Sequence, residues 1–526
     1  MQSMGLQGKR GMVEGRDVPW MLRQWVERRP NQTFLVWEPT SGVRRTWTYA
    51  QFDLEVRQLA AGLAARGVTP GSRVLIHLEN SPEFLLSWFA CAHVSAVAVC
   101  TNTRSVAAEL QYFLSHTRVV AAITQPALVG RVLDAGVPLT FIVLAEDDSG
   151  VITDPSITDT ELVAFSDLYG DAARAGERPA DPWADLAIQF TSGTTSRSKA
   201  VVFTHANAVW AAQVNAANFK LDGSDVTLIQ LPLYHINALS YLMWSTLWVG
   251  GVVVLQPRVS ISSFWDVSVR NGCTVASVLS FAAEIMAGQP VPAHNYRLWI
   301  FGVAHPEWEG RFGIRFLPFW GMTETISAGI VGDLSHPGPF MCMGRQAPGY
   351  EISIRQDGKP IAPGGSGQLY VRGERGVSLF KEYLDAPDAN RDSFDRDGWF
   401  DTGDLVRVDA EGNLFFGDRV KDVIRVGGEN VSASEVERVV AGSGLVKECA
   451  VVARKHPVLG EVPVVFVVPL AQDLGGLRSG VMAACQTNLA DFKVVRQVIV
   501  IDALPRNTLG KVDKKLLRER AVVVPG

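Results

Sequence analysis

The chain has 526 residues, of which 47% are hydrophobic and 20% are charged. This length exceeds what one compact core needs, so two or more domains are expected, and the hydrophobic content is typical of a globular protein. The formal net charge of -5 gives no reason to expect nucleic acid as a partner, so any affinity for phosphate must be local.

The six cysteines are spread along the chain without a Cys-x-x-Cys pair, so neither a zinc site nor a disulfide framework is indicated. The first twenty residues carry several charges and no apolar core, so no secretory signal is expected. The most apolar stretch, residues 244–255, is broken by Gly250 and Gly251 and is too short to cross a bilayer. We therefore expect a cytoplasmic protein with reduced cysteines and no transmembrane segment.

The first part of the chain alternates between strand patterns and helical patterns. Residues 52–66 have apolar positions at helical spacing and stop at Gly67, and Ser81 can cap a second helix that has Pro82 in its first turn. The strand patterns lie at 33–37, 47–49, 73–78, 94–100, 119–123, 141–144, 228–231 and 252–255. Strand, helix and strand in this order predict a parallel sheet with crossover helices.

The pattern changes after residue 365. Short strands at 368–372, 405–408 and 414–417 are separated by Asp-Gly and Glu-Gly turns, which predicts a small β subdomain. We predict an α/β protein with a large N-terminal domain, residues 1–417, of mixed and parallel sheets with helices plus this subdomain. Residues 418–526 are predicted to form a separate α+β C-terminal domain.

A polar loop lies between the apolar runs 186–190 and 201–203, and the pattern predicts strand, loop, strand. Glycine lets backbone N–H groups approach a ligand, hydroxyl groups donate hydrogen bonds and lysine adds a positive charge, so the loop suits a polyphosphate. Its candidate binding residues are Thr191, Ser192, Gly193, Thr194, Thr195 and Lys199. The same composition is also typical of an ordinary solvated turn.

Four further stretches follow this loop in a fixed order. They are Pro232-Leu233-Tyr234-His235, Trp320-Gly321-Met322-Thr323-Glu324, Trp399-Phe400-Asp401-Thr402-Gly403-Asp404 with Gly417-Asp418-Arg419, and Pro505 to Lys511. Together with the loop they resemble the AMP-forming adenylating enzymes, which include acyl-CoA synthetases, adenylation domains of peptide synthetases and luciferases. The resemblance spans nearly the whole chain and implies that the C-terminal domain is mobile.

Glu324 is the candidate metal ligand. A carboxylate near a triphosphate is repulsive unless a hard cation lies between them, so Glu324 suits Mg²⁺, although a lone glutamate is more often a surface or helix-start residue. The resemblance places the metal at Glu324, counts Thr194 among the catalytic residues, and stacks adenine on Trp320, where a tyrosine is usual. The turn Gly321-Met322-Thr323 then belongs to the nucleotide site.

Asp404 is a candidate acceptor for the two ribose hydroxyls, which is the role that acids have in dinucleotide folds. A lone aspartate in a turn is also often structural. The resemblance implies ribose binding by Asp404 and a contact of Arg419 with ribose or phosphate.

The C-terminal part contributes two candidate functions. The resemblance makes Lys511 the catalytic lysine that bridges the carboxylate and the α-phosphate, although its basic neighbours are equally typical of a solvated positive run. It makes Lys421 the hinge of the domain. The segment with Gly427, Gly428 and Glu429 would then meet pantetheine, although a Gly-Gly pair is also typical of a strand-to-helix turn.

The resemblance counts His235 among the catalytic residues and places the carboxylic acid near it, with Asn237, Gly302 and Thr325 lining the pocket. Histidine after a buried strand is also often a hydrogen-bonded core residue. Two features depart from the family pattern. Residues 196, 198 and 200 replace the usual glycine, proline and glycine of the loop, and the segment 302–320 is shorter than usual.

The resemblance implies an acid:CoA ligase that uses ATP, Mg²⁺ and CoA and forms an acyl-AMP intermediate. Its partners are a small-molecule carboxylic acid, ATP and CoA, with no nucleic acid, and a homodimer is left open. Two alternatives remain: an adenylating enzyme with another acceptor, such as a carrier protein or oxygen, and a catalytically impaired nucleotide-binding protein.

Overall fold

The computed structural model describes residues 6–146, 159–191, 198–419, 423–426, 429–457, 459–471, 475–489, 491–506 and 512–523. The chain divides into two compact units, the first of residues Met1–Ile352 with Val371–Phe400 and the second of Ser353–Tyr370 with Asp401–Gly526. These two units are defined by the packing within each of them. The boundary predicted from the sequence, at 417/418, is instead the expected position of a hinge, and it stays a prediction.

The first unit contains the helices α1 to α12. They are α1 (Leu6–Val13), α2 (Val18–Arg28), α3 (Tyr49–Ala65), α4 (Pro82–His93), α5 (Ala107–Thr117), α6 (Pro126–Asp134), α7 (His205–Asn218), α8 (Ser245–Val249), α9 (Ile261–Arg270), α10 (Ser280–Ala287), α11 (Pro306–Phe312) and α12 (Pro387–Asp392). Shorter turns are η2 (Phe165–Leu168), η3 (Ala172–Ala175) and η5 (Thr323–Thr325), and η4 (Asn237–Trp244) is a π-helix.

One sheet of this unit carries the strands β16-β15-β14-β13-β12-β10-β11-β1-β2 in that spatial order. Their bounds are β1 (Thr33–Trp37), β2 (Arg45–Thr48), β10 (Val226–Ile229), β11 (Val252–Leu255), β12 (Val275–Ser277), β13 (Leu298–Phe301), β14 (Arg315–Trp320), β15 (Ile330–Val331) and β16 (Cys342–Gln346). The pairs among β10, β11, β12, β13 and β14 are parallel. The carboxyl ends of these strands therefore lie at one edge.

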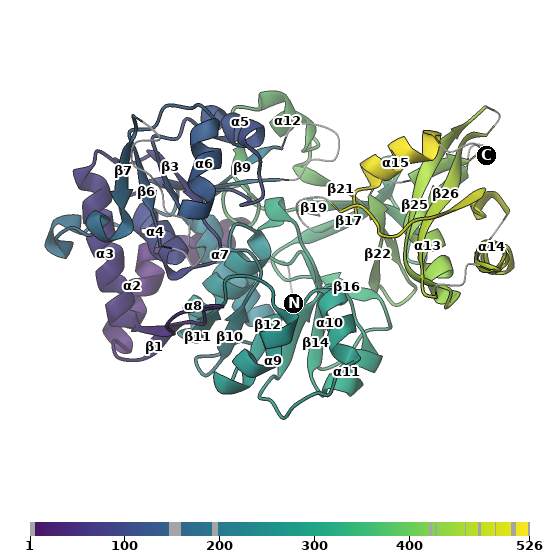
Figure 1. Ribbon diagram of the computed structural model, residues 1–526, viewed down its shortest axis with the longest axis horizontal. Helices are drawn as coiled ribbons and strands as arrows, with labels where there is room; N and C mark the ends of the chain where they lie inside the picture. The colour runs from purple at the N-terminus through teal and green to yellow at the C-terminus, as the bar shows by residue number, and fades with distance from the viewer. Residues whose placement is uncertain are drawn as a thin grey trace. The chain divides into compact units, whose positions relative to one another are not determined.

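The faces of this sheet are covered by different helices. A cluster of buried aromatic and aliphatic side chains joins the sheet to α9, α10 and α11, which Figure 1 shows beside β12 and β14. Leu228 belongs to that cluster, and its neighbour Thr227 receives a hydrogen bond from Thr246 of α8. Because successive strand residues point to opposite faces, α8 lies on the other side.

The second sheet has the order β20-β9-β8-β4-β3-β5-β6-β7. Its strands are β3 (Arg73–His77), β4 (Val97–Cys100), β5 (Ala121–Thr124), β6 (Phe141–Leu144), β7 (Glu161–Ala164), β8 (Asp185–Phe190), β9 (Ala200–Thr204) and β20 (Glu382–Tyr383). The strands from β8 to β7 are parallel, and α5 and α6 pack on them through an apolar cluster. The predicted parallel sheet with crossover helices is confirmed.

Local signals place α3 and α4 well. The predicted cap is confirmed, since the Ser81 side chain accepts a hydrogen bond from the backbone N–H of Phe84 and Pro82 begins the helix. The strand predicted from residue 94 begins only at Val97, because Val94 ends α4 and Ser95 adopts a left-handed φ of 57°. A turn therefore takes the place of the first three predicted strand residues.

The second unit holds two sheets. Five strands follow one another in the order β18-β17-β19-β21-β22 and include the predicted strands of the β subdomain. They are β17 (Glu351–Gln356), β18 (Lys359–Pro360), β19 (Ser366–Arg372), β21 (Trp399–Val408) and β22 (Leu414–Arg419). The other sheet contains β23 (Val423–Val426), β24 (Glu429–Ser432), β25 (Val446–His456), β26 (Gly460–Pro469) and β27 (Gln497–Val500).

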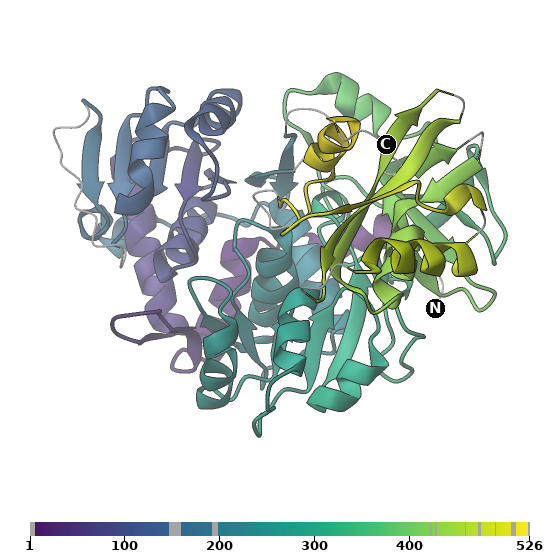
Figure 2. The same ribbon diagram turned by 45° about the vertical axis from the view of Figure 1, so that its right-hand side comes forward.

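Helices cover both faces of this last sheet, as Figure 2 shows. They are α13 (Ala433–Gly442), α14 (Leu477–Asn488) and α15 (Lys514–Val523), with the short turn η7 (Asp491–Lys493). Val451 belongs to the cluster with α13 and α14, whereas Ala450 and Val452 belong to the cluster with α15. Successive side chains of β25 therefore pack against helices on opposite faces of the sheet, which gives the predicted α+β arrangement.

Candidate functional site

The two ends of the predicted phosphate loop are held together by an antiparallel pair. Phe190 of β8 pairs with Ala200 of β9, and the backbone N–H of Thr191 donates to the carbonyl of Lys199 at 3.0 Å. The hydroxyl of Tyr112, on α5, donates to the Ser198 carbonyl at 3.1 Å. The strand–loop–strand prediction is confirmed, while the loop residues Ser192, Gly193, Thr194 and Thr195 lie outside the described residues.

The parallel strands bring three of the predicted segments to one edge of their sheet. Residues 230–237 follow β10, Gly302 follows β13, and the run from Gly321 to Thr325 follows β14. Ligands in sheets of this kind bind beyond the carboxyl ends of the strands. The position of these segments therefore follows from the parallel pairing of strands that are far apart in the sequence.

The turn after β14 is tightly packed, and this packing explains why residue 321 is glycine. A Cβ atom at Gly321 would lie 2.3 Å from the hydroxyl oxygen of Tyr241 and 3.1 Å from the Ser327 carbonyl oxygen. The Thr325 hydroxyl accepts from the Met322 N–H at 3.0 Å, and Ile326 adopts a left-handed φ of 65°. This left-handed conformation is strained for a β-branched residue, and such strain is concentrated at functional sites.

Glu324 is buried within this turn, with only 4% of its surface exposed. Its Oε1 atom accepts a hydrogen bond of 2.8 Å from the hydroxyl of Tyr383, and its backbone carbonyl accepts from the Phe380 N–H at 2.9 Å. Burial, followed by the Glu324 charge, raises the pKa of Tyr383 well above its usual value. The phenol therefore stays protonated and can donate to the carboxylate.

Lys199, at the end of the predicted phosphate loop, also contacts Tyr383. Its Nζ atom lies over the Tyr383 ring, 4.3 Å from the ring centroid. A cation over the face of an aromatic ring is attracted by the electrons of that ring. The structure thus brings together the predicted cation and the predicted metal ligand, with Tyr383 in contact with both.

The residues around Glu324 fit a magnesium ion. Among the described residues, no group of three or more His, Cys, Asp or Glu side chains could hold a metal by itself. Mg²⁺ is commonly held by one or two carboxylates together with substrate phosphates, so one buried carboxylate close to a phosphate loop suits it. A dedicated cage of protein ligands is not required.

The segment with His235 is held by Asn80, which is 3% exposed. The Asn80 Nδ2 atom donates to the carbonyls of Leu231 at 2.9 Å and Gln256 at 3.1 Å, and its Oδ1 atom accepts from the Leu233 N–H at 2.8 Å. This side chain satisfies backbone groups that the ends of β10 and β11 leave unpaired. The path of the chain into His235 is thereby fixed.

His235 and Asn237 stand at the start of the π-helix η4, a form of helix that is frequent at functional sites. The His235 ring contacts the Tyr234 ring at a centroid distance of 4.7 Å. The Oδ1 atom of Asn237 is buried and has no hydrogen-bond partner among the described residues. A buried acceptor of this kind suits a bound ligand.

Trp320 ends β14 and is 6% exposed. Its backbone carbonyl accepts from the Gly329 N–H at 3.0 Å, and a Cβ at Gly329 would lie 3.1 Å from the indole ring. Met322 and Thr323 follow in the same turn, and Gly302 has open space where a Cβ would be. The role of Trp320 toward adenine stays a prediction.

Asp404 lies in the second unit and is 4% exposed. Its backbone N–H donates to the Thr402 hydroxyl at 3.1 Å, and in the pairing of β21 with β22 its partner is Arg419. The two predicted ribose contacts are therefore cross-strand partners in the backbone.

The remaining predictions fall largely on positions that the structure leaves out. Lys511, Lys421, Gly427 and Gly428 lie outside the described residues, and Glu429 is described only through its backbone in β24. Their roles stay predictions.

Sequence reasoning missed Tyr383 and the role of Asn80. Tyr383 lies in the short strand β20, which pairs with β9 although 178 positions separate the ends of the two strands. No local pattern around it marks a site. In the sequence, Asn80 was recognised only as a polar residue that follows a buried strand, just beyond the carboxyl end of β3.

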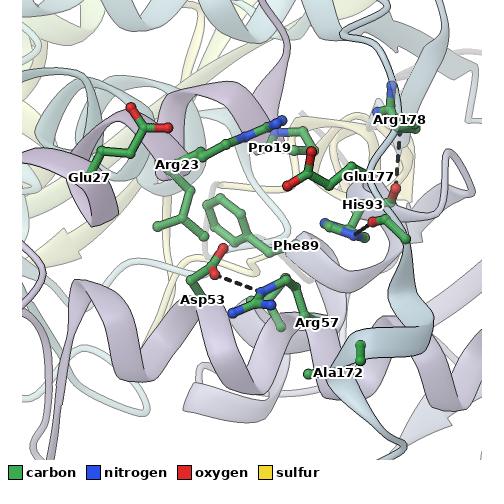
Figure 3. A pocket seen from close by; sticks show the side chains of 14 residues that line it. Pro19, Arg23, Glu27, Asp53, Arg57, Phe89, His93, Ala172, Glu177 and Arg178 are labelled. Carbon is green, nitrogen blue, oxygen red and sulfur yellow. Dashed lines mark hydrogen bonds and ion pairs between the residues drawn. The ribbon is translucent and has the colours of Figure 1, made fainter.

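A separate cavity of about 470 Å³ lies between α2, α3, α4 and residues 172–178 (Figure 3). Arg57 forms an ion pair with Asp53 at 2.8 Å, and Arg178 forms one with the buried Asp17 at 3.0 Å. None of the residues predicted for the nucleotide or acid site lines this cavity. Its paired charges do not indicate a particular ligand.

No helix in the described part of the chain has the length and the apolar character that a bilayer span requires.

Comparison with known families supplies two matches. The model of the AMP-binding enzyme family matches residues 22–384, and the model of the AMP-binding enzyme C-terminal domain matches residues 435–511. A crotonobetaine/carnitine-CoA ligase of Salmonella enteritidis PT4 (strain P125109) is 32% identical over 507 residues, which cover 93% of this chain and 96% of the relative.

Two solved structures are similar to this chain over most of its length. The O-succinylbenzoate coenzyme A synthetase (MenE) of Bacillus subtilis, in complex with ATP and magnesium ion, is 26% identical, with a TM-score of 0.81 over 95% of this chain and 98% of its own. The ATP-bound MatB of Rhodopseudomonas palustris is 25% identical, with a TM-score of 0.80 over 95% and 98% of the two chains.

Proposed function

The chain belongs to the family of AMP-binding enzymes, and from this premise we propose which of its residues carry the reaction. It is an AMP-forming acid:CoA ligase that activates a carboxylic acid with ATP to acyl-AMP, releases pyrophosphate and then forms the acyl-CoA. ATP, Mg²⁺ and CoA take part in this reaction. The roles of individual residues below are proposals.

The observation that carries the proposal is that Lys199 and Glu324 both contact Tyr383. A cation at the end of a hydroxyl-rich loop, together with a buried carboxylate from another turn, suits a metal-bound polyphosphate. When bound, Mg²⁺ would neutralise charge on the phosphate oxygens, and Glu324 would hold it. Lys199, together with Thr191, Ser192, Gly193, Thr194 and Thr195, would bind the phosphates.

We assign adenine to Trp320 and the turn Gly321-Met322-Thr323, and the ribose hydroxyls to Asp404. The support for Asp404 is a buried acid whose backbone partner across the β-ladder is Arg419. A carboxylate can accept hydrogen bonds from two vicinal hydroxyls, and a guanidinium can reach a phosphate.

The acid would lie near His235, with Asn237, Gly302 and Thr325 around it. All four residues follow the carboxyl ends of parallel strands or begin the π-helix after β10. The buried Asn237 Oδ1 suits an acid that carries a hydrogen-bond donor. The relatives named above suggest crotonobetaine, carnitine and O-succinylbenzoate as the first acids to test.

Residues of the C-terminal domain would act in two successive steps, adenylation and thioester formation. We propose that Lys511 stabilises the negative charge that builds up during adenylation, because a cation aimed at developing charge lowers the barrier. Lys421 would be the hinge for the change to the thioester step, in which Gly427, Gly428 and Glu429 meet CoA. A homodimer and a cytoplasmic location also stay predictions.

The test is direct. The purified protein is incubated with ATP, Mg²⁺, CoA and a panel of acids, and pyrophosphate, AMP and thioester are measured separately. The proposal expects all three products in equal amounts for at least one acid. Acyl-adenylate and pyrophosphate without any thioester would contradict the use of CoA, and tight ATP binding without pyrophosphate release across the panel would favour an inactive nucleotide-binding protein.

A further inference from the structure

Tyr383 is attached to the strand that leaves the phosphate loop. Strand β20 pairs antiparallel with β9 so that Tyr383 lies opposite Val201. The N–H of Leu384 donates to the Ala200 carbonyl and the N–H of Lys381 donates to the Val202 carbonyl, both at 2.9 Å. The backbone of Tyr383 therefore has a fixed position relative to the residue that follows Lys199.

The side chain of Tyr383 extends from this strand to the acid in the turn after β14. Its hydroxyl is 2.8 Å from Glu324 Oε1, and the two residues are 3% and 4% exposed. The N–H of Phe380, three positions earlier, donates to the Glu324 carbonyl at 2.9 Å. One short segment thus holds both the backbone and the carboxylate of the proposed metal ligand.

The ring of Tyr383 makes the second contact, because the Lys199 Nζ lies 4.3 Å from its centroid. A phenol donates a charge-assisted hydrogen bond to a carboxylate through its edge and attracts a cation through its face. These two contacts use different parts of one side chain. They can therefore be removed separately.

We propose that Tyr383 is a positioning residue that holds the Glu324 carboxylate for Mg²⁺ through its hydroxyl and holds the Lys199 ammonium for the ATP phosphates through its ring. This inference rests on the proposed function, in which Glu324 holds the metal. It adds a residue outside the loop and the acidic turn, and it links the loop to the acid within one unit.

Two variants separate the contacts. Tyr383→Phe keeps the ring and loses the hydroxyl, so the Mg²⁺ concentration that gives half-maximal pyrophosphate release rises about 10- to 100-fold, as for other residues that orient a metal ligand. Its KM for ATP at saturating Mg²⁺ stays close to that of the wild type. Tyr383→Leu loses both contacts, so it raises this KM as well, by about 2- to 30-fold.

The matched control is Tyr169→Phe. The Tyr169 hydroxyl donates to Glu55 Oε2 at 2.9 Å, which is the same type of bond at a place remote from the candidate site. We expect this variant to keep the wild-type dependence on Mg²⁺. Thioester formation from supplied acyl-AMP and CoA needs neither Mg²⁺ nor the triphosphate, so both Tyr383 variants keep it.

A second measurement does not depend on turnover. Titration of ATP into the protein at a series of free Mg²⁺ concentrations gives the metal dependence of nucleotide binding directly, even if no acid in the panel is accepted. An unchanged Mg²⁺ dependence in Tyr383→Phe overturns the positioning role while leaving the ligase function standing. Loss of the thioester step to the same extent as adenylation also overturns it, because it indicates a general structural defect.

Discussion

Asn80 offers the sharpest test of how the acid site is built. Replacing Asn80 with alanine removes three hydrogen bonds to the buried backbone groups of Leu231, Leu233 and Gln256. Each buried polar group left without a partner costs about 1–3 kcal/mol, so the three together reduce the free energy of unfolding by about 3–9 kcal/mol if no water replaces the bonds.

The assay combines urea unfolding with acid kinetics. The expected result is a lower midpoint for unfolding together with a raised KM for the acid, because the segment that leads to His235 loses its support. Asn488→Ala serves as control, since the Asn488 side chain makes an exposed hydrogen bond to Ala484 at the end of α14. If Asn80→Ala unfolds at the same urea concentration as this control and binds the acid normally, the bonds do not hold the segment.

Three other predictions follow from single positions. Gly321→Ala places a Cβ atom 2.3 Å from the Tyr241 hydroxyl oxygen, so we expect about 1–3 kcal/mol of destabilisation and a loss of adenylation; wild-type pyrophosphate release would contradict the packing. Lys511→Ala should lower adenylation by about 100-fold or more while leaving thioester formation from supplied acyl-AMP largely intact, and equal loss of both steps would count against the hinge. Burial lowers the pKa of His77 from its usual value of 6.5 to about 4, so its imidazole stays neutral in the folded state. The stability from this group is present above about pH 6.5 and is lost as the pH falls toward 4. His77→Asn should therefore reduce the fall in unfolding free energy between these pH values, and an unchanged fall would refute this assignment.

The sequence predicted much of the local structure. The Ser81 cap, the strands on either side of the loop, and the short strands of the β subdomain depend on residues close together in the chain. Errors lay at boundaries such as Val94 to Ala96, where two apolar residues flank Ser95 in a turn. Apolar character alone does not distinguish a strand from the end of a helix and the turn after it.

The order of the motifs was sufficient to place this chain among the adenylating enzymes, because loop, turn and acid each carry their chemistry in a few adjacent residues. Tertiary structure alone decided that Tyr383 meets Glu324, which is 59 positions away, and that its ring also lies beneath Lys199. That contact depends on β20 joining the edge of a sheet formed by distant strands. Strand pairing of this range is set by the packing of the whole unit, and it leaves no periodic pattern in the sequence around Tyr383.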